Sequence, residues 1–383
     1  MHKVKLMTVF GTRPEAIKMA PLILELKKHD SFETIVCVTG QHREMLDQVL
    51  GIFGIDVDFD LNIMQEKQSL TDITVNAIKG MEGVFSKVTP ELVLVHGDTT
   101  TTFAASLAAF YHKIKVAHVE AGLRTHDKWF PFPEEMNRKL TGDLADIHFA
   151  PTAGAKQNLI AEGVAADNIF VTGNTVIDVL PYTIKEDYYF KTVALNEIDY
   201  DKMRIVVVEA HRRENWGRPM ENICRAIKRL LREYSDMVVV YPVHLNPAVR
   251  DTVLSMLDGL DRCVLVDPLD IDDMHNLLYR SYMVLTDSGG LQEEVPSMGK
   301  PVLVLRRETE RPEAVEAGTV KLVGLEEKDI YREASLLLSD AREYLAMANS
   351  VNPYGDGQAS KRISGYLLNY YGFSKAKPEE FNR

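Results

Sequence analysis

Short apolar runs alternate with helical patterns along almost the whole chain, and this alternation limits the fold more than any other feature. In the first half, five runs rich in β-branched residues are apolar on both faces, as strands buried in a parallel sheet are. They span residues 4–10, 34–39, 92–96, 116–119 and 147–150. Helical patterns lie between them, at residues 14–28, 69–88, 100–113 and 134–144. Strands that alternate with helices predict an α/β fold built on a parallel sheet.

A second alternating series follows and predicts a second domain of the same class. Its expected strands span residues 204–208, 237–241, 264–266, 283–286 and 302–305. Residues 181–202 are weakly patterned and rich in Tyr, Asp, Glu and Lys, so we interpret them as the connection between domains. At 383 residues the chain is long enough for two or three domains. We expect one domain over residues 1–172, rejoined by about 365–383, and another over residues 173–364.

Charge and cysteine content exclude several classes of protein. The formal net charge of -12 argues against a general binder of nucleic acid or of membrane surfaces, so basic residues should matter locally, beside an anionic ligand. Cys37, Cys224 and Cys263 are widely spaced and odd in number, which predicts reduced thiols. The apolar run at the start is soon ended by Arg13 and Glu15, and is too short for a signal peptide. We expect a cytoplasmic protein.

The polar residues after the first predicted strand form one candidate ligand site. The segment begins with Gly11, continues through Arg13 and reaches Lys18. Ligands of doubly wound folds bind at the carboxyl ends of the strands. A glycine lets the backbone approach a phosphate, a helix start offers free N–H groups, and Arg13 can bind phosphate oxygens with two hydrogen bonds. The alternative is an ordinary helix N-terminus with charges on the surface.

A similar turn follows a strand of the second predicted domain. Ser288, Gly289 and Gly290 open a helix there, and their N–H groups can bind a pyrophosphate without the lysine of a P-loop. Glu294 lies within reach of a ribose diol, although a plain serine cap would also explain the turn. Together the two turns predict a diphosphate held in the cleft between two domains. Residues 355–360 nearly match a dinucleotide fingerprint but follow no strand, so we expect no nicotinamide cofactor.

Acid–base residues are densest between residues 96 and 138. Asp98 and Glu120 each follow an apolar strand, and Glu134 begins a helix after a proline-rich loop. Three carboxylates converging near Arg124 and Arg13 can hold different pKa values and share acid and base roles. Helix capping and surface ion pairs are the alternative for each of them.

Histidines provide the remaining candidates. His211 follows the first strand of the second domain beside Arg212, a setting that suits a departing phosphate. A structural role is the alternative for His211, and His244 remains open between the two. The sequence contains neither HExxH nor CxxC, so we expect no metal site.

These segments together resemble one family. The chain is similar, in order from residue 10 to about 363, to the non-hydrolysing UDP-N-acetylglucosamine 2-epimerases, through the segments GTRPEAIKMAPLI, TGQHREML, VHGDTTTTFAASLAA, HVEAGLRT, PFPEEMNR, VTGNTVIDVL, HRREN, TDSGGLQEE and RPEAVEAGT. The resemblance implies a GT-B-type fold of two Rossmann-like domains and a homodimer without a cofactor. It also implies interconversion of UDP-N-acetylglucosamine (UDP-GlcNAc) and UDP-N-acetylmannosamine (UDP-ManNAc), through elimination and re-addition of UDP, to supply ManNAc units for cell-surface polysaccharide.

The resemblance also implies roles for individual residues. It places Asp98, Glu120 and Glu134 at the reacting sugar and His211 at the leaving UDP. The residues implied to bind substrate are Arg13, Lys18, Ser288, Gly289, Gly290, Glu294 and Arg311. A second, regulatory UDP-GlcNAc site is implied, for which the candidates are Gln41, Gln68, Arg212 and His244. A hydrolysing epimerase, a GT-B glycosyltransferase and a nucleotide-sugar sensor remain the alternative functions.

Overall fold

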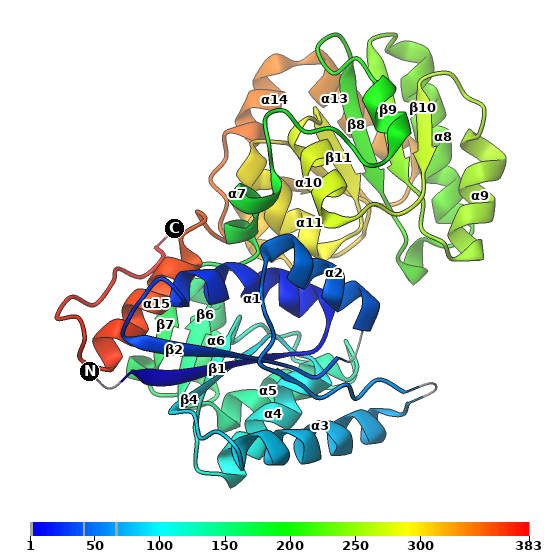
Figure 1. Ribbon diagram of the computed structural model, residues 1–383. Coiled ribbons are helices and arrows are strands. Elements are labelled where there is room, and N and C mark those ends of the chain that lie inside the picture. Colours follow the sequence, from blue (N-terminus) through cyan, green and yellow to red (C-terminus); the bar gives the residue numbers. More distant parts are fainter. Residues whose placement is uncertain (1–2, 41–42, 66–67, 383) are drawn as a thin grey trace. The chain divides into compact units, whose positions relative to one another are not determined.

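The computed structural model describes residues 3–40, 43–65 and 68–382, and the side chains of residues 43–45 are not described. The chain forms two compact units, of which unit 1 comprises Met1–Val179 and Tyr354–Arg383 and unit 2 comprises Leu180–Pro353. Each unit is a parallel sheet with helices packed on it (Figure 1). The chain therefore has two Rossmann-like units.

Unit 1 contains a seven-stranded parallel sheet with the order β3-β2-β1-β4-β5-β6-β7. Its strands are β1 (Val4–Phe10), β2 (Phe32–Val38), β3 (Phe59–Asp60), β4 (Leu92–His96), β5 (Lys115–Val119), β6 (Ile147–Ala150) and β7 (Ile169–Val171). Its helices are α1 (Arg13–Leu26), α2 (Arg43–Phe53), α3 (Leu70–Phe85), α4 (Thr100–Tyr111), α5 (Glu134–Leu144), α6 (Ala153–Ala161) and α15 (Ala359–Tyr370). Strand order reverses direction between β1 and β4, where doubly wound folds bind ligands.

Unit 2 contains a six-stranded parallel sheet with the order β10-β9-β8-β11-β12-β13. Its strands are β8 (Arg204–Glu209), β9 (Met237–Pro242), β10 (Cys263–Val266), β11 (Met283–Thr286), β12 (Val302–Val304) and β13 (Val320–Leu322). Its helices are α7 (Leu180–Thr183), α8 (Arg218–Glu233), α9 (Pro247–Leu257), α10 (Ile271–Tyr279), α11 (Gly289–Glu294), α12 (Pro312–Glu316), α13 (Glu327–Ser339) and α14 (Ala341–Ala348). The corresponding switch lies between β8 and β11.

The central strands are buried on both faces, which explains their continuous apolar sequences. Every residue of β4 and of β9 is buried. In unit 2, Val206 and Val208 of β8 belong to one core cluster with Ile223 and Ile227 of α8. Burial on both faces removes the need for alternating polar residues, so these strands contain runs of valine and leucine. The core thereby fixes the carboxyl ends of the strands, where the polar residues begin.

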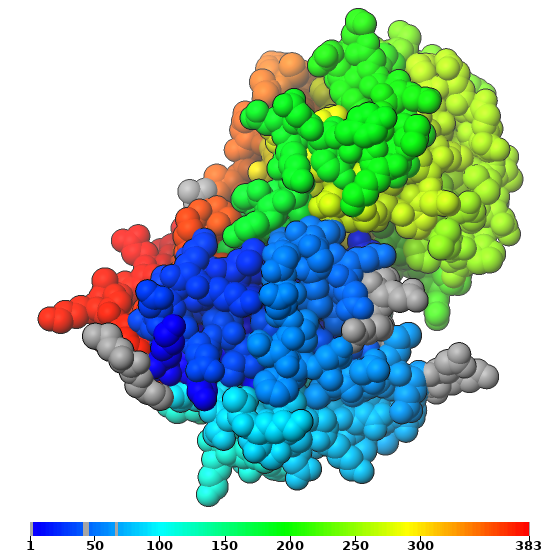
Figure 2. All heavy atoms as spheres, in the orientation of Figure 1, coloured from blue at the N-terminus to red at the C-terminus, as the bar shows by residue number. Residues whose placement is uncertain are grey.

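The segment that we interpreted as a connection between domains belongs to unit 2. Within residues 181–202, Phe190 is fully buried, and the backbone N–H groups of Lys191 and Thr192 donate to the carboxylate of Asp273 in α10. Tyr188 donates to the same carboxylate. Figure 2 shows the green part of the chain, around residue 200, spread over the surface of unit 2 on the face drawn. This segment therefore packs on helix α10, and the boundary between the units lies before it, at Leu180.

The C-terminal boundary also differs from the expected one. We expected the chain to rejoin the first domain at about residue 365, whereas the crossing lies between Pro353 and Tyr354. Helix α15 packs against α1 of unit 1. Its first N–H groups, on Ala359 and Ser360, donate to the carboxylate of Asp178 at 3.1 and 2.6 Å. This cap holds the helix start in unit 1 and extends that unit to Val179, beyond the predicted residue 172.

No helix in the described part of the chain is long and apolar enough to cross a membrane. Cys37, Cys224 and Cys263 are free thiols.

Replacement of Asp178 by alanine is expected to destabilise unit 1. The carboxylate is only 5% exposed and accepts two N–H groups of the α15 N-terminus, which would lose their partner. We expect the free energy of unfolding to fall by about 1–2 kcal/mol, the usual cost of a lost cap. Urea denaturation would measure the change, with Asp30→Ala on the surface of the same unit as the control. Equal midpoints for the two variants would contradict the capping role.

Candidate active site

The turn after β1 is organised by a buried carboxylate. One oxygen of Glu15 accepts the N–H groups of Gly11 and Thr12 at 3.0 and 2.8 Å, and the other accepts the hydroxyls of Thr99 and Thr102. Thr12 and Glu15 also form the capping box of α1. Burial raises the pKa of Glu15, and these hydrogen bonds oppose that shift. The N–H groups of Gly11 and Thr12 are therefore occupied by Glu15, and the half-buried Arg13 side chain stays the candidate for binding an anion at this turn.

Gly11 is required by close packing. A Cβ atom at this position would lie 2.0 Å from Oγ1 of Thr39 and 2.7 Å from Oγ1 of Thr101. These hydroxyls are hydrogen-bonded to each other at 2.9 Å across the ends of β2 and α4. The glycine therefore lets the turn lie against the neighbouring strand and helix.

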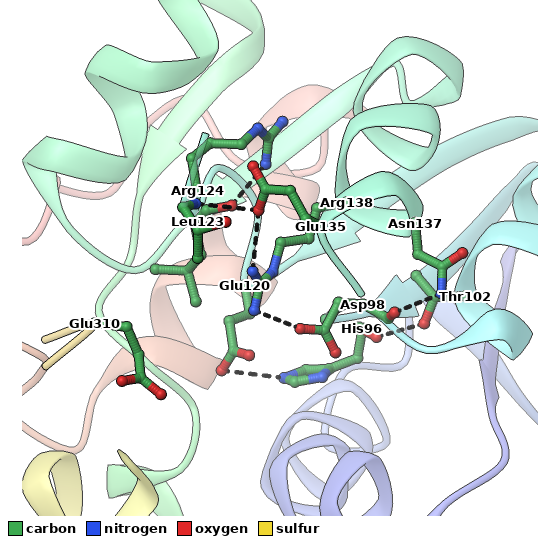
Figure 3. Close-up of polar contacts among 12 residues, drawn as sticks. His96, Asp98, Thr102, Glu120, Leu123, Arg124, Glu135, Asn137, Arg138 and Glu310 are labelled. Atoms are coloured by element: carbon green, nitrogen blue, oxygen red, sulfur yellow. Dashed lines mark hydrogen bonds and ion pairs between the residues drawn. The ribbon is translucent and has the colours of Figure 1, made fainter. Parts of the chain in front are cut away.

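Two of the three predicted carboxylates are held by basic side chains of unit 1. Arg138 of α5 forms an ion pair with Asp98 at 2.6 Å and with Glu135 at 3.2 Å, and lies between the two acids (Figure 3). Glu120 follows β5 and pairs with Lys18 of α1 at 2.5 Å. These contacts connect the ends of β4 and β5 with α1 and α5.

Glu120 has the most constrained environment of the three. Its side chain is 8% exposed and its backbone has a φ of 63°, a conformation that side-chain-bearing residues seldom adopt. Oε2 accepts a hydrogen bond from Nδ2 of Asn174 at 2.8 Å and lies 3.8 Å from Nε2 of His96 (Figure 3). Backbone strain of this kind gathers at functional sites, where surrounding contacts maintain it.

Adjacent glutamates at the start of α5 have different environments. Glu135 is fully buried and accepts the N–H groups of Thr125 and His126, both at 3.1 Å, so it fixes the loop before the helix. Glu134 is half-buried at the first helical position. Among the described residues it forms no ion pair. Glu134 thus stays a candidate for contact with the sugar, whereas Glu135 is a structural acid.

Arg124 does not join the carboxylates. Its guanidinium is fully buried and pairs with Glu162 at the end of α6, at 2.7 Å. The expectation that the three acids converge near Arg124 is therefore wrong, because Glu162 accepts its donors and Arg138 takes the place beside Asp98. The sequence contained Arg138 in the same segment but gave no reason to prefer it.

Three histidines lie behind these acids at strand positions. Burial lowers the pKa of His96 to about 4, of His118 to about 3 and of His148 to about 4. They are neutral at physiological pH. His96 is the one adjacent to Glu120, at 3.8 Å.

In unit 2, His211 lies at the switch between β8 and β11. Its Nδ1 is 2.7 Å from a carboxylate oxygen of Glu209 and 3.8 Å from Oδ1 of Asp287. The hydrogen bond to Glu209 raises the pKa of His211, and burial opposes that shift. Asp287 is fully buried and accepts the N–H groups of His211 and Arg212 at 2.9 and 2.8 Å. The sequence analysis missed Glu209, because a single acid at a strand end carries no signal.

Two guanidiniums lie beside the predicted phosphate turn. A Cβ atom on Gly289 would lie 3.7 Å from an Arg212 nitrogen, 3.7 Å from Oε1 of Glu310 and 3.9 Å from the guanidinium carbon of Arg311. Ser288 precedes α11 without a side-chain cap bond, so the alternative of a plain serine cap is not realised. Arg212 and Arg311 pair with Glu310 and Glu293 respectively. The turn thus combines glycine backbone with two guanidiniums that can donate to an anion, each already paired with a carboxylate of the unit.

Glu294 is oriented by a histidine. Nε2 of His275 lies 3.0 Å from Oε2 of Glu294, and Nδ1 of His275 lies 2.7 Å from the hydroxyl of Thr183. Glu294 is 13% exposed, so one carboxylate oxygen is fixed inside the unit. A fixed carboxylate suits recognition of a diol, the role predicted for it.

The residues suggested for a regulatory site fall in different places. The His244 ring stacks on that of His211, with centroids 5.2 Å apart, and Arg212 adjoins Gly289, so both lie in the unit 2 cluster. Gln68 belongs to unit 1 and donates to the carbonyl of Ile63. Gln41 lies outside the described residues. The regulatory assignment stays a prediction.

Within the described residues, one group has the composition of a metal site. Ligand-type atoms of Glu209, His211 and Asp287 lie within 4.8 Å of one another. The 2.7 Å contact between Glu209 and His211 is a hydrogen-bond distance, and Asn215 also donates to Asp287 at 2.7 Å. These contacts make the group a hydrogen-bonded cluster around the imidazole of His211.

Comparison with known proteins identifies the relatives of the chain. The sequence model described as UDP-N-acetylglucosamine 2-epimerase matches residues 24–368. The chain is 57% identical to the UDP-N-acetylglucosamine 2-epimerase of Bacillus subtilis, covering 100% of this chain and 99% of that protein. It is 53% identical to the Escherichia coli K12 enzyme of the same name, covering 96% and 99%.

Solved structures agree with these relatives. A UDP-GlcNAc 2-epimerase from Neisseria meningitidis bound to UDP-GlcNAc has a TM-score of 0.85 and 50% identity, covering 96% of this chain and 100% of that one. The glycotransferase of kitacinnamycin is 10% identical at a TM-score of 0.66, covering 96% and 99%, and shares the fold alone. The fold class is GT-B-like, as the sequence predicted.

Replacement of Gly11 by alanine is expected to disturb the turn after β1. The added methyl group would overlap Thr39 and Thr101, and overpacking of this kind costs about 1–3 kcal/mol. Urea denaturation would report the loss. Gly51→Ala in α2 is the matched control, because a Cβ atom there meets nothing within 4 Å. That control should be neutral or slightly stabilising, since alanine favours a helix over glycine. Equal stability of the two variants would contradict the packing role of Gly11.

Proposed function

This chain belongs to the UDP-N-acetylglucosamine 2-epimerase family, and on that premise we propose that it interconverts UDP-GlcNAc and UDP-ManNAc without releasing free sugar. The observation that carries the proposal is the division of chemistry between the units. Unit 1 gathers carboxylates after β4 and β5, with Lys18 beside Glu120 and Arg138 beside Asp98. Unit 2 gathers guanidiniums and a histidine of raised pKa around a glycine turn. Proton transfer and stabilisation of a diphosphate are the two tasks that this reaction demands.

The chemistry of the substrate explains why both tasks are needed. Inversion at C2 of the sugar requires a C–H bond to break, and no adjacent carbonyl makes that hydrogen acidic. If a base removes the C2 proton while the C1–O bond breaks, a C1=C2 double bond forms and UDP leaves with the electron pair. Protonation of C2 on the opposite face and re-addition of UDP at C1 then give the epimer. Overall, one proton is lost and one is regained, and no oxidant is consumed.

We assign the proton transfers to Asp98, Glu120 and Glu134. Lys18 and Asn174 orient Glu120, Arg138 orients Asp98, and Glu134 begins α5. Carboxylates in such different environments can divide acid and base roles between them.

We assign stabilisation of the departing UDP to Arg13 of unit 1 and to the cluster of unit 2. His211 and Arg311 supply positive charge beside the turn that Ser288, Gly289 and Gly290 form. Preorganised donors of this kind stabilise charge that develops in a transition state. Glu294, oriented by His275, is the candidate for the ribose hydroxyls.

The wider assignments also belong to the proposal. The Neisseria meningitidis relative was solved with UDP-GlcNAc bound, which supports this nucleotide sugar as the substrate. We propose a homodimer as the assembly, and supply of ManNAc units for cell-surface polysaccharide as the role.

Incubation with UDP-GlcNAc in D2O, without added cofactor, tests the reaction. Proton NMR is expected to show UDP-ManNAc with deuterium at C2 and little free ManNAc, because C2 is reprotonated by a solvent-derived proton. Free ManNAc with an equal amount of UDP would replace the proposal by a hydrolysing epimerase. Conversion that occurs only after an acceptor is added would replace it by a glycosyltransferase.

Amide replacements test the carboxylates. Asp98→Asn, Glu120→Gln and Glu134→Gln are each expected to lower kcat by about 10²- to 10⁴-fold, the range that general acid–base groups contribute. UDP affinity, measured by calorimetry, should change far less, because these residues act on the sugar. Asp143→Asn, an exposed position on α5, is the matched control and should keep full turnover. Normal turnover in all three variants would refute the assignment.

A further inference from the structure

Glu209 is the last residue of β8 and lies directly against His211. Its Oε1 is 2.7 Å from Nδ1 of His211, and its Oε2 accepts the hydroxyl of Thr286 at 2.9 Å. Thr286 is the residue paired with Glu209 on the neighbouring strand β11. Both oxygens of the carboxylate are thus engaged, and the side chain is fixed at the carboxyl end of the sheet.

The His211 ring is constrained from other directions as well. It stacks on His244, which follows β9, with an angle of 15° between the rings. The backbone of His211 donates to Asp287 and accepts a hydrogen bond from the indole of Trp216. Because Nδ1 faces Glu209, Nε2 is the ring nitrogen left for a ligand, and the side chain is 35% exposed.

We propose that Glu209 is a positioning residue that keeps His211 in its doubly protonated form, with Nε2–H available to the leaving diphosphate. This inference rests on the proposed function, in which His211 acts on UDP. An imidazolium gives two advantages there. It places a positive charge beside a group that gains negative charge. Both of its ring nitrogens carry a proton, so Nε2 is always a hydrogen-bond donor.

The charged groups around the ring favour this state. The carboxylates of Glu209 and Asp287 both face Nδ1 of His211, at 2.7 and 3.8 Å. The positive charge of Arg212, the next residue, opposes protonation of the ring. His244 adds a second titratable ring. The bond to Glu209 is the largest influence and raises the pKa of His211. Because a raised pKa extends the protonated form to higher pH, loss of Glu209 should remove that form first at alkaline pH.

The variant Glu209→Gln tests the inference, because it preserves size and removes charge. Long-range ¹H–¹⁵N NMR of histidine-labelled protein would follow the rings between about pH 5 and 9. The resonance of His211 would be assigned by its loss in His211→Asn. In parallel, the pH profile of kcat/KM would be recorded for wild type, Glu209→Gln and Glu209→Asp. Asp251→Asn removes an exposed carboxylate of the same unit and serves as the control for net charge.

We expect the pKa of His211 to fall by about one unit or more in Glu209→Gln, as loss of an adjacent opposite charge implies. The alkaline limb of the pH profile of kcat/KM should move to lower pH by the same number of pH units. At a pH above the pKa of His211 in both proteins, Glu209→Gln should therefore be about tenfold slower than wild type. Below both of these pKa values, its rate should approach that of wild type. A purely structural defect would lower the rate at every pH. In Glu209→Asp, the pKa of His211 should lie between the values of wild type and of Glu209→Gln, because aspartate retains the negative charge.

Several outcomes would overturn the inference. An unchanged pKa of His211 in Glu209→Gln would do so, as would an unmoved alkaline limb. Loss of wild-type activity on chelation, restored by a divalent cation, would assign Nδ1 to a metal ion instead of a proton. If His211→Asn retains full turnover, the proposed role of His211 fails, while the NMR titration still decides whether Glu209 sets its protonation.

Discussion

In both units, a buried carboxylate at the switch point of the sheet accepts hydrogen bonds from the backbone of the loop that follows the unit's first strand. Glu15 accepts the N–H groups of Gly11 and Thr12 in unit 1, and the fully buried Asp287 accepts those of His211 and Arg212 in unit 2. Burying a carboxylate is costly unless hydrogen bonds compensate it, and the loop N–H groups provide them. The side chains of these two loops therefore project from a backbone that is already fixed, which would lower the entropic cost of ordering them around a ligand.

Much of the fold could be predicted because the central strands carry long apolar runs. Residues 4–10, 92–96 and 147–150 were predicted with the bounds that the structure has. The sequence analysis missed β3, β7 and β13, which have two or three residues each, too few to show a period. It also missed α6, whose residues are nearly unpatterned. The interpretation of residues 181–202 failed because charged and aromatic residues there satisfy a partner far along the chain, Asp273.

Candidate site residues could be chosen from residue type and position, but their pairings could not. Strand ends indicated Asp98, Glu120 and His211, because ligands bind at that edge of parallel sheets. The partner of Glu120, Lys18, is 102 residues away, and the choice between Arg124 and Arg138 depends on where Glu162 lies. Such long-range pairs follow from packing of complete elements. The contacts of Glu209 with His211 and Thr286 exist only because β8 pairs with β11, so the sequence alone could not indicate them.

The return of the chain to unit 1 has a consequence for biosynthesis. Unit 2 is an uninterrupted stretch, Leu180–Pro353, inserted into a unit whose last helix is α15. During translation the ribosome releases all of unit 2 before the residues of α15 that cover α1 emerge. Domains generally fold as units while they are synthesised. The nascent first sheet must therefore wait, with one face of α1 uncovered, until the inserted unit has been made, and the unit begun first is completed last.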